Sequence, residues 1–160
     1  MSMLDAFEAI VRRAKNVGVR EPAAEAVTVH PFDERNVHPD IAMVTLKLFD
    51  NGHYSQATFE AFKYVDKVIK KLAGSNESGF KLMMAAFDEN KPVIELTDMR
   101  TTSDKDEQLG YRHMLAGSML AIRNPRGHEI IADPIDRCLD HLSVASVFLR
   151  RIGERKLPKP

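Results

Sequence analysis

Residues 55–73 read SQATFEAFKYVDKVIKKLA, and their apolar side chains recur at intervals of three and four. Most of the charged side chains take the other faces, which is typical of an amphipathic helix. Gly74 follows directly and is the residue type that ends helices most often. The stretch therefore predicts one long helix, whose apolar stripe consists of Ala57, Ala61, Phe62, Val65, Val68, Ile69 and Leu72.

The same periodicity continues on both sides of this helix. It predicts further helices near residues 41–49, 79–88 and 107–122, while the polar residues 89–106 predict a surface loop. Asp133 is a good N-cap and Pro134 suits the first helical position, so a last helix is expected to begin there and end near Gly153. Because strand-like alternation is almost absent, we expect an all-α antiparallel bundle of four to five core helices.

The chain divides into three expected parts. Residues 1–37 comprise a short amphipathic helix near residues 3–16 and an extended arm with a brief strand near residues 27–29. Residues 38–153 form the bundle, and residues 154–160 form a C-terminal tail. The last helix has more apolar circumference than one packing seam needs, which predicts either a central position or contact with a second subunit.

Composition excludes several classes of protein. The 160 residues include 23 basic and 23 acidic side chains, so the net charge is zero and nonspecific binding to duplex nucleic acid is not favoured. Cys138 is the only cysteine, which excludes a disulfide framework. No apolar run is long enough for a membrane span, and the N-terminus does not have the pattern of a secretory signal. We therefore expect a cytoplasmic protein without membrane attachment.

Residues 123–128 read RNPRGH and lie between two predicted helices. Arg123 carries paired donors that match phosphate oxygens, and His128 transfers protons near neutral pH, so these two are the candidate catalytic residues. Asn124 and Arg126 are candidate substrate-binding residues. The proline and the glycine of the motif predict a sharp turn that brings Arg123 and His128 together. RNA is the favoured substrate because its 2′-hydroxyl supplies an internal nucleophile.

Other polar residues have simpler interpretations. The remaining histidines are scattered without the spacing of a metal site, so neither a metal nor a cofactor is predicted. Glu60 is either an acid that reaches toward the motif or, as helical spacing favours, a surface carboxylate paired with Lys63 or Lys67. Arg123 and His128 have alternatives too: they form a hydrogen-bonding pair at an interface, or the motif only caps two helices.

Several segments, in order, carry a resemblance to a known family. They are His38-Pro39, residues 48–54 (LFDNGHY), 59–63 (FEAFK) and 79–83 (GFKLM), Gly110-Tyr111, and residues 116–129 (AGSMLAIRNPRGHE). Between His38 and Ile152 the chain resembles the Ymh family of bacterial proteins associated with phage resistance. That family is similar to the HEPN superfamily, helical bundles whose hallmark is an arginine followed four to six residues later by a histidine at the end of the bundle.

The resemblance implies a metal-independent endoribonuclease that leaves 2′,3′-cyclic phosphate and 5′-hydroxyl ends and works as a homodimer. Arg123 and His128 match the family motif, and Asn124 matches the polar residue that often follows the arginine. HEPN toxins that are controlled by adenylylation carry a tyrosine two residues after the histidine, where this chain has Ile130. The resemblance also implies an antitoxin or defence partner. Some HEPN-like domains are instead noncatalytic dimerisation modules or bind RNA or protein, and this is the alternative function.

Overall fold

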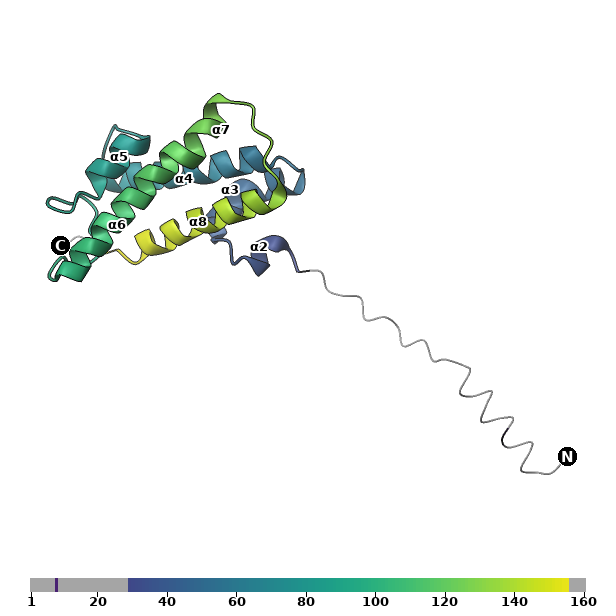
Figure 1. Ribbon diagram of the computed structural model, residues 1–160, viewed down its shortest axis with the longest axis horizontal. Coiled ribbons are helices and arrows are strands. Elements are labelled where there is room, and N and C mark those ends of the chain that lie inside the picture. The colour runs from purple at the N-terminus through teal and green to yellow at the C-terminus, as the bar shows by residue number, and fades with distance from the viewer. Residues whose placement is uncertain (1–7, 9–28, 156–160) are drawn as a thin grey trace.

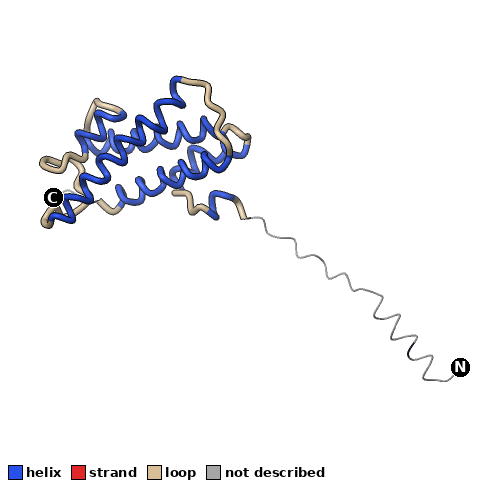
Figure 2. Tube along the Cα trace, in the orientation of Figure 1, coloured by secondary structure: helices blue, strands red, loops and turns tan. Residues whose placement is uncertain are grey.

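The helices of this protein form a single bundle, which the computed structural model describes for Glu8 and residues 29–155 (Figure 1). Within this part every regular element is a helix and there is no strand, so the predicted all-α class is confirmed (Figure 2). The helix expected near residues 3–16 and the strand expected near residues 27–29 fall almost wholly outside the described residues.

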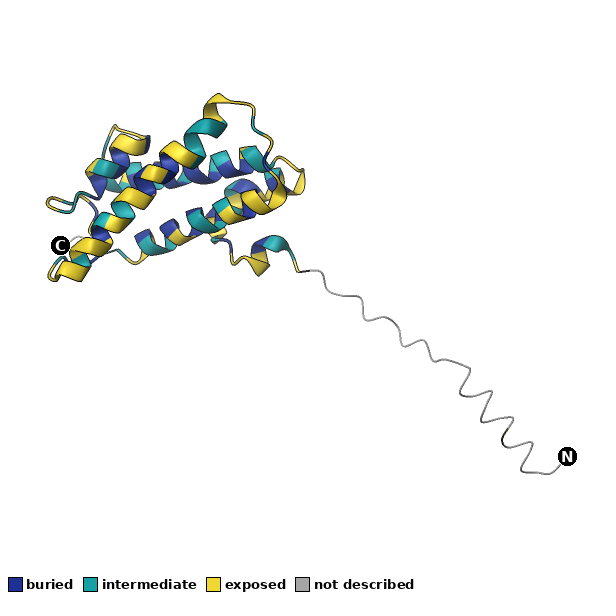
Figure 3. Cartoon of the chain, in the orientation of Figure 1, coloured by how far each residue is buried: buried dark blue, intermediate teal, exposed yellow. Residues whose placement is uncertain are grey.

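The central helix is α4 (Tyr54–Ala73), which agrees with the predicted helix to within one residue. It contacts α3 (Pro39–Asp50), α5 (Gly79–Ala86) and α8 (Ile135–Gly153), so its apolar stripe supplies the middle of the core (Figure 3). Gly74 ends the helix in the left-handed conformation, with φ of 58°. The buried residues of α4 are Ala57, Thr58, Ala61, Phe62, Val65, Asp66 and Ile69.

Helix α8 lies against α4 and α3, and this central position explains its broad apolar surface. Two large apolar side chains of α8, Ile135 and Val147, remain exposed. The prediction that Asp133 caps this helix is wrong: Pro134 occupies the N-cap position, and Asp133 binds Arg126 instead. Two charge-assisted hydrogen bonds outcompete one capping bond. The buried residues of α8 are Cys138, Leu139, Leu142, Ala145, Ser146, Phe148, Leu149 and Ile152.

The end of the segment expected to be an arm belongs to the bundle. It contains the short helix α2 (Pro31–Glu34), and its apolar residues Phe32 and Val37 are buried in the core. The backbone N–H of His38 donates to the Oγ of Ser146 at 2.9 Å, which ties the start of α3 to α8.

The segment between α5 and α6 (Thr102–Ser118) is anchored by a buried amide. Gln108 accepts a hydrogen bond from the backbone N–H of Leu96 at 2.9 Å and donates to the carbonyl of Ile94 at 2.9 Å. Ile94 and Leu96 are themselves buried. The prediction that residues 89–106 form only a surface loop is therefore wrong, because the loop supplies two core residues and its last five residues belong to α6.

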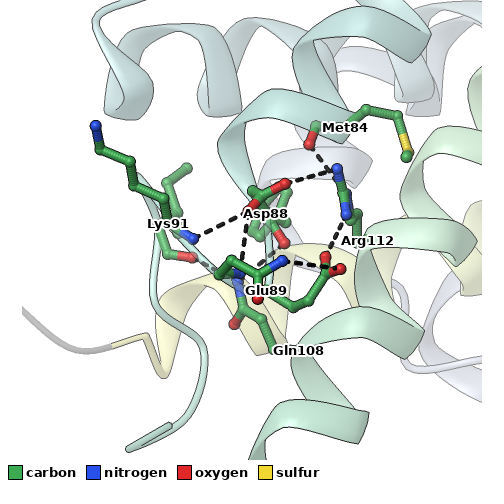
Figure 4. A network of polar contacts seen from close by, with 9 residues as sticks. Met84, Asp88, Glu89, Lys91, Gln108 and Arg112 are labelled. Carbon is green, nitrogen blue, oxygen red and sulfur yellow. Dashed lines mark hydrogen bonds and ion pairs between the residues drawn. The ribbon is translucent and has the colours of Figure 1, made fainter.

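A second anchor of this segment is Arg112 on α6. Its guanidinium forms ion pairs with Asp88 and Glu89, and its Nε–H donates to the carbonyl of Met84 at 3.0 Å (Figure 4). The acidic residues that follow α5 are thereby fixed to α6. These contacts hold α5 and α6 together as a pair. The motif at residues 123–128 follows α6, so this pair positions it.

Candidate active site

The motif at residues 123–128 is helical. Helix α6 runs directly into a π-helical turn, η1 (Met119–Arg123), and then into α7 (Asn124–His128). The N–H of Asn124 donates to the carbonyl of Met119, five residues earlier. Extended backbone begins at Glu129, with φ of −128° and ψ of 154°. The predicted sharp turn inside the motif is therefore wrong, since the chain turns after His128.

Pro125 explains why the helix widens here. In a regular α-helix a proline lacks the N–H that would bind the carbonyl four residues earlier, and its ring clashes with that carbonyl. The π-helical turn directly before Pro125 uses hydrogen bonds to the carbonyl five residues earlier, which avoids this conflict. Nη1 of Arg126 donates to the carbonyl of Ile122 at 2.8 Å, so a side chain of the motif also hydrogen-bonds the backbone of the widened turn.

Arg123 lies half-buried between α4 and α5. Its Cζ is 5.8 Å from the centroid of the Phe59 ring, and its Nη1 donates to Oδ1 of Asn124 at 3.2 Å. A Cβ added to Gly79, the first residue of α5, would be 3.7 Å from the same Nη1. The Nε of Arg123 is buried and has no hydrogen-bond partner in the described part of the chain. Of its five N–H groups, only one is therefore engaged by a described protein acceptor.

His128 is the last residue of α7, and its side chain is exposed. Across residues 29–155 its ring has no hydrogen bond or ion pair. No hydrogen bond joins it to Arg123, five positions earlier on the same helical segment. Within the described part of one chain, the imidazole of His128 has no hydrogen-bond partner, and the guanidinium of Arg123 has one. The two side chains are not hydrogen-bonded to each other.

Arg126 forms a bidentate ion pair with Asp133. Nε lies 2.6 Å from Oδ2 and Nη2 lies 2.7 Å from Oδ1, and the two side chains are 6% and 0% exposed. Burial alone would raise the pKa of the Asp133 carboxyl, but the hydrogen bonds and the charge of Arg126 hold it below its ordinary value. Arg126 thus connects α7 to the loop before α8, and its contact with substrate stays a prediction.

Ser55 at the start of α4 fixes the same loop. Its Oγ donates to the carbonyl of Ile131 at 2.5 Å and accepts the N–H of Asp133 at 2.9 Å. A surface cavity of about 290 Å³ opens beside these contacts, and neither Arg123 nor His128 lines it. The cavity is lined by Gly52, His53, Tyr54, Ser55, Gln56, Ile131, Ala132 and Asp133.

Two residues of α4 near the motif have clear positions. Glu60 forms an ion pair with Lys63 at 3.0 Å, the surface pairing that helical spacing favoured. Phe59 was not among the candidate residues, although it contacts Arg123. Its signal in the sequence is a large aromatic side chain that falls outside the predicted apolar stripe of its helix. Such a residue must pack against some other part of the molecule.

Among the described residues, no group of three or more His, Cys, Asp or Glu side chains is arranged to hold a metal ion. None of the helices in the described ranges is both long and apolar enough to cross a membrane.

The fold and the site together define a class of protein. It is an all-α bundle in which the segment after α6 carries a helical Arg/His motif, with the arginine half-buried and the histidine exposed. Residues 35–152 match the family described as "Protein of unknown function (Hypoth_ymh)", and this is most of the chain. The protein therefore belongs to the Hypoth_ymh family. No curated protein matches the chain, and no solved structure matches it.

Proposed function

We propose that this chain is a metal-independent endoribonuclease of HEPN type that acts in the cytoplasm in phage defence or as a toxin. The observation that carries the proposal is the state of the two motif side chains. Arg123 has one engaged N–H group of five, and His128 is exposed without a partner in the described structure. Both lie on the continuous helical segment formed by η1 and α7.

The chemistry follows from these two groups. Arg123 donates to the non-bridging oxygens of the phosphate and stabilises the charge that develops there. A neutral His128 removes the proton of the ribose 2′-hydroxyl, whose oxygen attacks phosphorus while the bond to the 5′-oxygen breaks. The departing 5′-oxygen takes its proton from the protonated imidazolium of His128 in another copy of the chain, which becomes neutral as the first His128 becomes protonated. The products are a 2′,3′-cyclic phosphate and a 5′-hydroxyl end.

A homodimer is part of this proposal, and the outer face of α6 and η1 supports it. Met114 and Leu120 are 53% and 50% exposed, and the small residues Gly117 and Ala121 between and beside them are exposed too. Their spacing of three and four places them along one side of the helix that leads to His128. Most of the apolar surface of α8 is buried in the core, although Ile135 and Val147 stay exposed, so the face of α6 and η1 is the proposed contact with a second copy.

The decisive experiment measures RNA cleavage by the purified protein in the presence of EDTA. Wild type is expected to cut RNA and leave cyclic phosphate ends, while His128→Ala and Arg123→Ala lose that activity. His53→Ala is the matched control, because His53 is exposed and makes no capping hydrogen bond. Intact RNA with all variants, under conditions in which a known HEPN ribonuclease cuts, would favour the noncatalytic dimerisation or binding module.

The dimer is tested separately by light scattering. Wild type is expected to have twice the mass of the chain, and Leu120→Glu is expected to be monomeric because the substitution puts a charge into the proposed contact. Ile130 is exposed and has no hydroxyl group, so the proposal includes no adenylylation at that position. An antitoxin or defence partner remains part of the proposal.

A further inference from the structure

Phe59 on α4 lies next to two residues of the motif, Arg123 and Gly127. The guanidinium of Arg123 lies 5.8 Å from the centroid of its ring. A Cβ added to Gly127 would come within 2.8 Å of its Cε2, so the ring lies directly beneath the backbone of α7. We propose that Phe59 is a positioning residue that sets the guanidinium of Arg123 and the end of α7, and with it His128. This inference rests on the proposed ribonuclease function.

The hydrogen bonds of Arg123 are too few to fix its side chain. Its Nε has no described partner, and its one hydrogen bond, at 3.2 Å, goes to Asn124, the next residue in the chain. A cation over an aromatic face is attracted to the negative face of the ring and loses freedom there. The ring of Phe59 therefore supplies the orientation that hydrogen bonds do not.

Helix α4 also fixes the start of α5, which lies near the guanidinium of Arg123. Asp66, seven residues after Phe59 and thus on the same helix face, accepts the N–H of Gly79 at 2.5 Å. That bond holds the start of α5 near Arg123, where a Cβ on Gly79 would be 3.7 Å from Nη1. Arg123 is thus bracketed between the Phe59 ring and the start of α5.

The backbone of α7 depends on the same ring. Gly127 precedes His128 directly, and only the lack of a side chain lets it approach Phe59 so closely. A ring that is packed against Gly127 limits how α7 lies on α4. His128 ends α7, and its side chain has no hydrogen bond or ion pair among residues 29–155, so we infer that its position follows from that packing.

The test compares Phe59→Leu with Phe80→Leu. Phe80 lies next to Gly79 on α5 and is exposed, so the control makes the same chemical change near Arg123 while leaving the ring of Phe59 in place. Phe59→Leu is expected to lower kcat on the order of 10²-fold while KM changes little, because misplaced catalytic groups still leave the rest of the RNA contact intact. If Phe59→Leu does not fold, as judged by circular dichroism, Phe59→Met takes its place.

A second readout does not depend on activity. Hydrogen exchange of the Arg123 Nε–H, followed by ¹⁵N NMR, is expected to be slow in wild type and Phe80→Leu and faster in Phe59→Leu. Unchanged exchange in Phe59→Leu would overturn the inference, as would an unchanged kcat in a protein that cleaves RNA. If wild type cleaves no RNA, the ribonuclease proposal fails by itself, and the exchange rates alone decide the role of Phe59.

Discussion

The guanidinium of Arg126 and the carboxylate of Asp133 face each other through two parallel hydrogen bonds in a buried site. Arg126 belongs to the motif, and Asp133 belongs to the loop that leads into α8. The pair therefore ties the end of α7 to the start of the last core helix. The stability of the bundle and the position of the motif depend on the same contact.

We expect Arg126→Ala to lower the free energy of unfolding by about 3–5 kcal/mol, because removing one partner leaves an uncompensated buried charge. Urea unfolding measures the change. Arg137→Ala is the control: Arg137 lies 3.7 Å from Asp133 but its side chain is 57% exposed, so about 0–1 kcal/mol is expected. Equal losses in the two variants would contradict a special role for the buried pair.

The Asp133 carboxyl should make stability depend on acid pH. Its pKa in the folded protein lies below the ordinary value of 3.8, so the stabilisation is complete above pH 3.8 and is lost as pH falls through the folded pKa. Unfolding free energies of wild type and Asp133→Asn, measured between pH 7 and pH 3, check this. Asp133→Asn should be less stable at neutral pH, and the difference should shrink in acid. A constant difference would show that the ionised form contributes nothing.

His141 on α8 should give a separate loss of stability at milder pH. Its Nδ1 is buried without a partner in the described structure, and burial followed by the charge of Arg126 lowers the pKa of the ring below 6.5. Arg137 lowers it further, while Asp133 and Asp140 act in the opposite sense.

Below pH 6.5 His141 therefore binds a proton more readily in the unfolded chain than in the folded one. The free energy of unfolding falls as the pH decreases below 6.5. His141→Gln should remove this dependence between pH 7 and pH 5. The slope of unfolding free energy against pH in urea series is the measurement. An identical slope in wild type and the variant would contradict the assignment.

Gly127→Ala should destabilise the protein by about 1–3 kcal/mol, because the added methyl group would be 2.8 Å from the Phe59 ring. Gly110→Ala is the matched control on α6, where a Cβ meets nothing within 4 Å. The control should be about 0.5–1 kcal/mol more stable than wild type, since alanine favours helix more than glycine does. Thermal unfolding of both variants, with opposite signs expected, tests the close approach of α7 to Phe59.

Local pattern in the sequence was sufficient for the elements whose contacts repeat along a helix. The stripe of residues 55–73 predicted α4, because every third or fourth side chain faces the same core. Pairings between distant elements were not predictable in this way. Gln108 anchors Leu96 in a segment that was predicted to be only a surface loop. Asp133 was predicted to cap α8 but pairs with Arg126. In both cases the partner is distant in the sequence and becomes available only when the chain folds.

The candidate site divides in the same manner. Arg123 and His128 were identifiable from their chemistry and spacing, and the structure places them at the end of one helical segment. Arg123 is surrounded by Phe59 of α4 and Gly79 of α5. Nothing in the sequence connects these two residues with the motif. The π-helical turn was missed because proline and glycine are more often signals of a turn than of a widened helix.

The π-helical turn at residues 119–123 has the geometry of a one-residue insertion in an α-helix. A π-helical turn accommodates one extra residue by widening the helix, so the side chains beyond it lie about 100° from where an unbroken α-helix would place them by residue number. The side of the molecule on which His128 lies therefore does not follow from the 3.6-residue period of α6. Deletion of one residue in this turn is expected to keep both motif side chains and to restore α-helical hydrogen bonding there, with the ring of Pro125 then set against the carbonyl four residues before it.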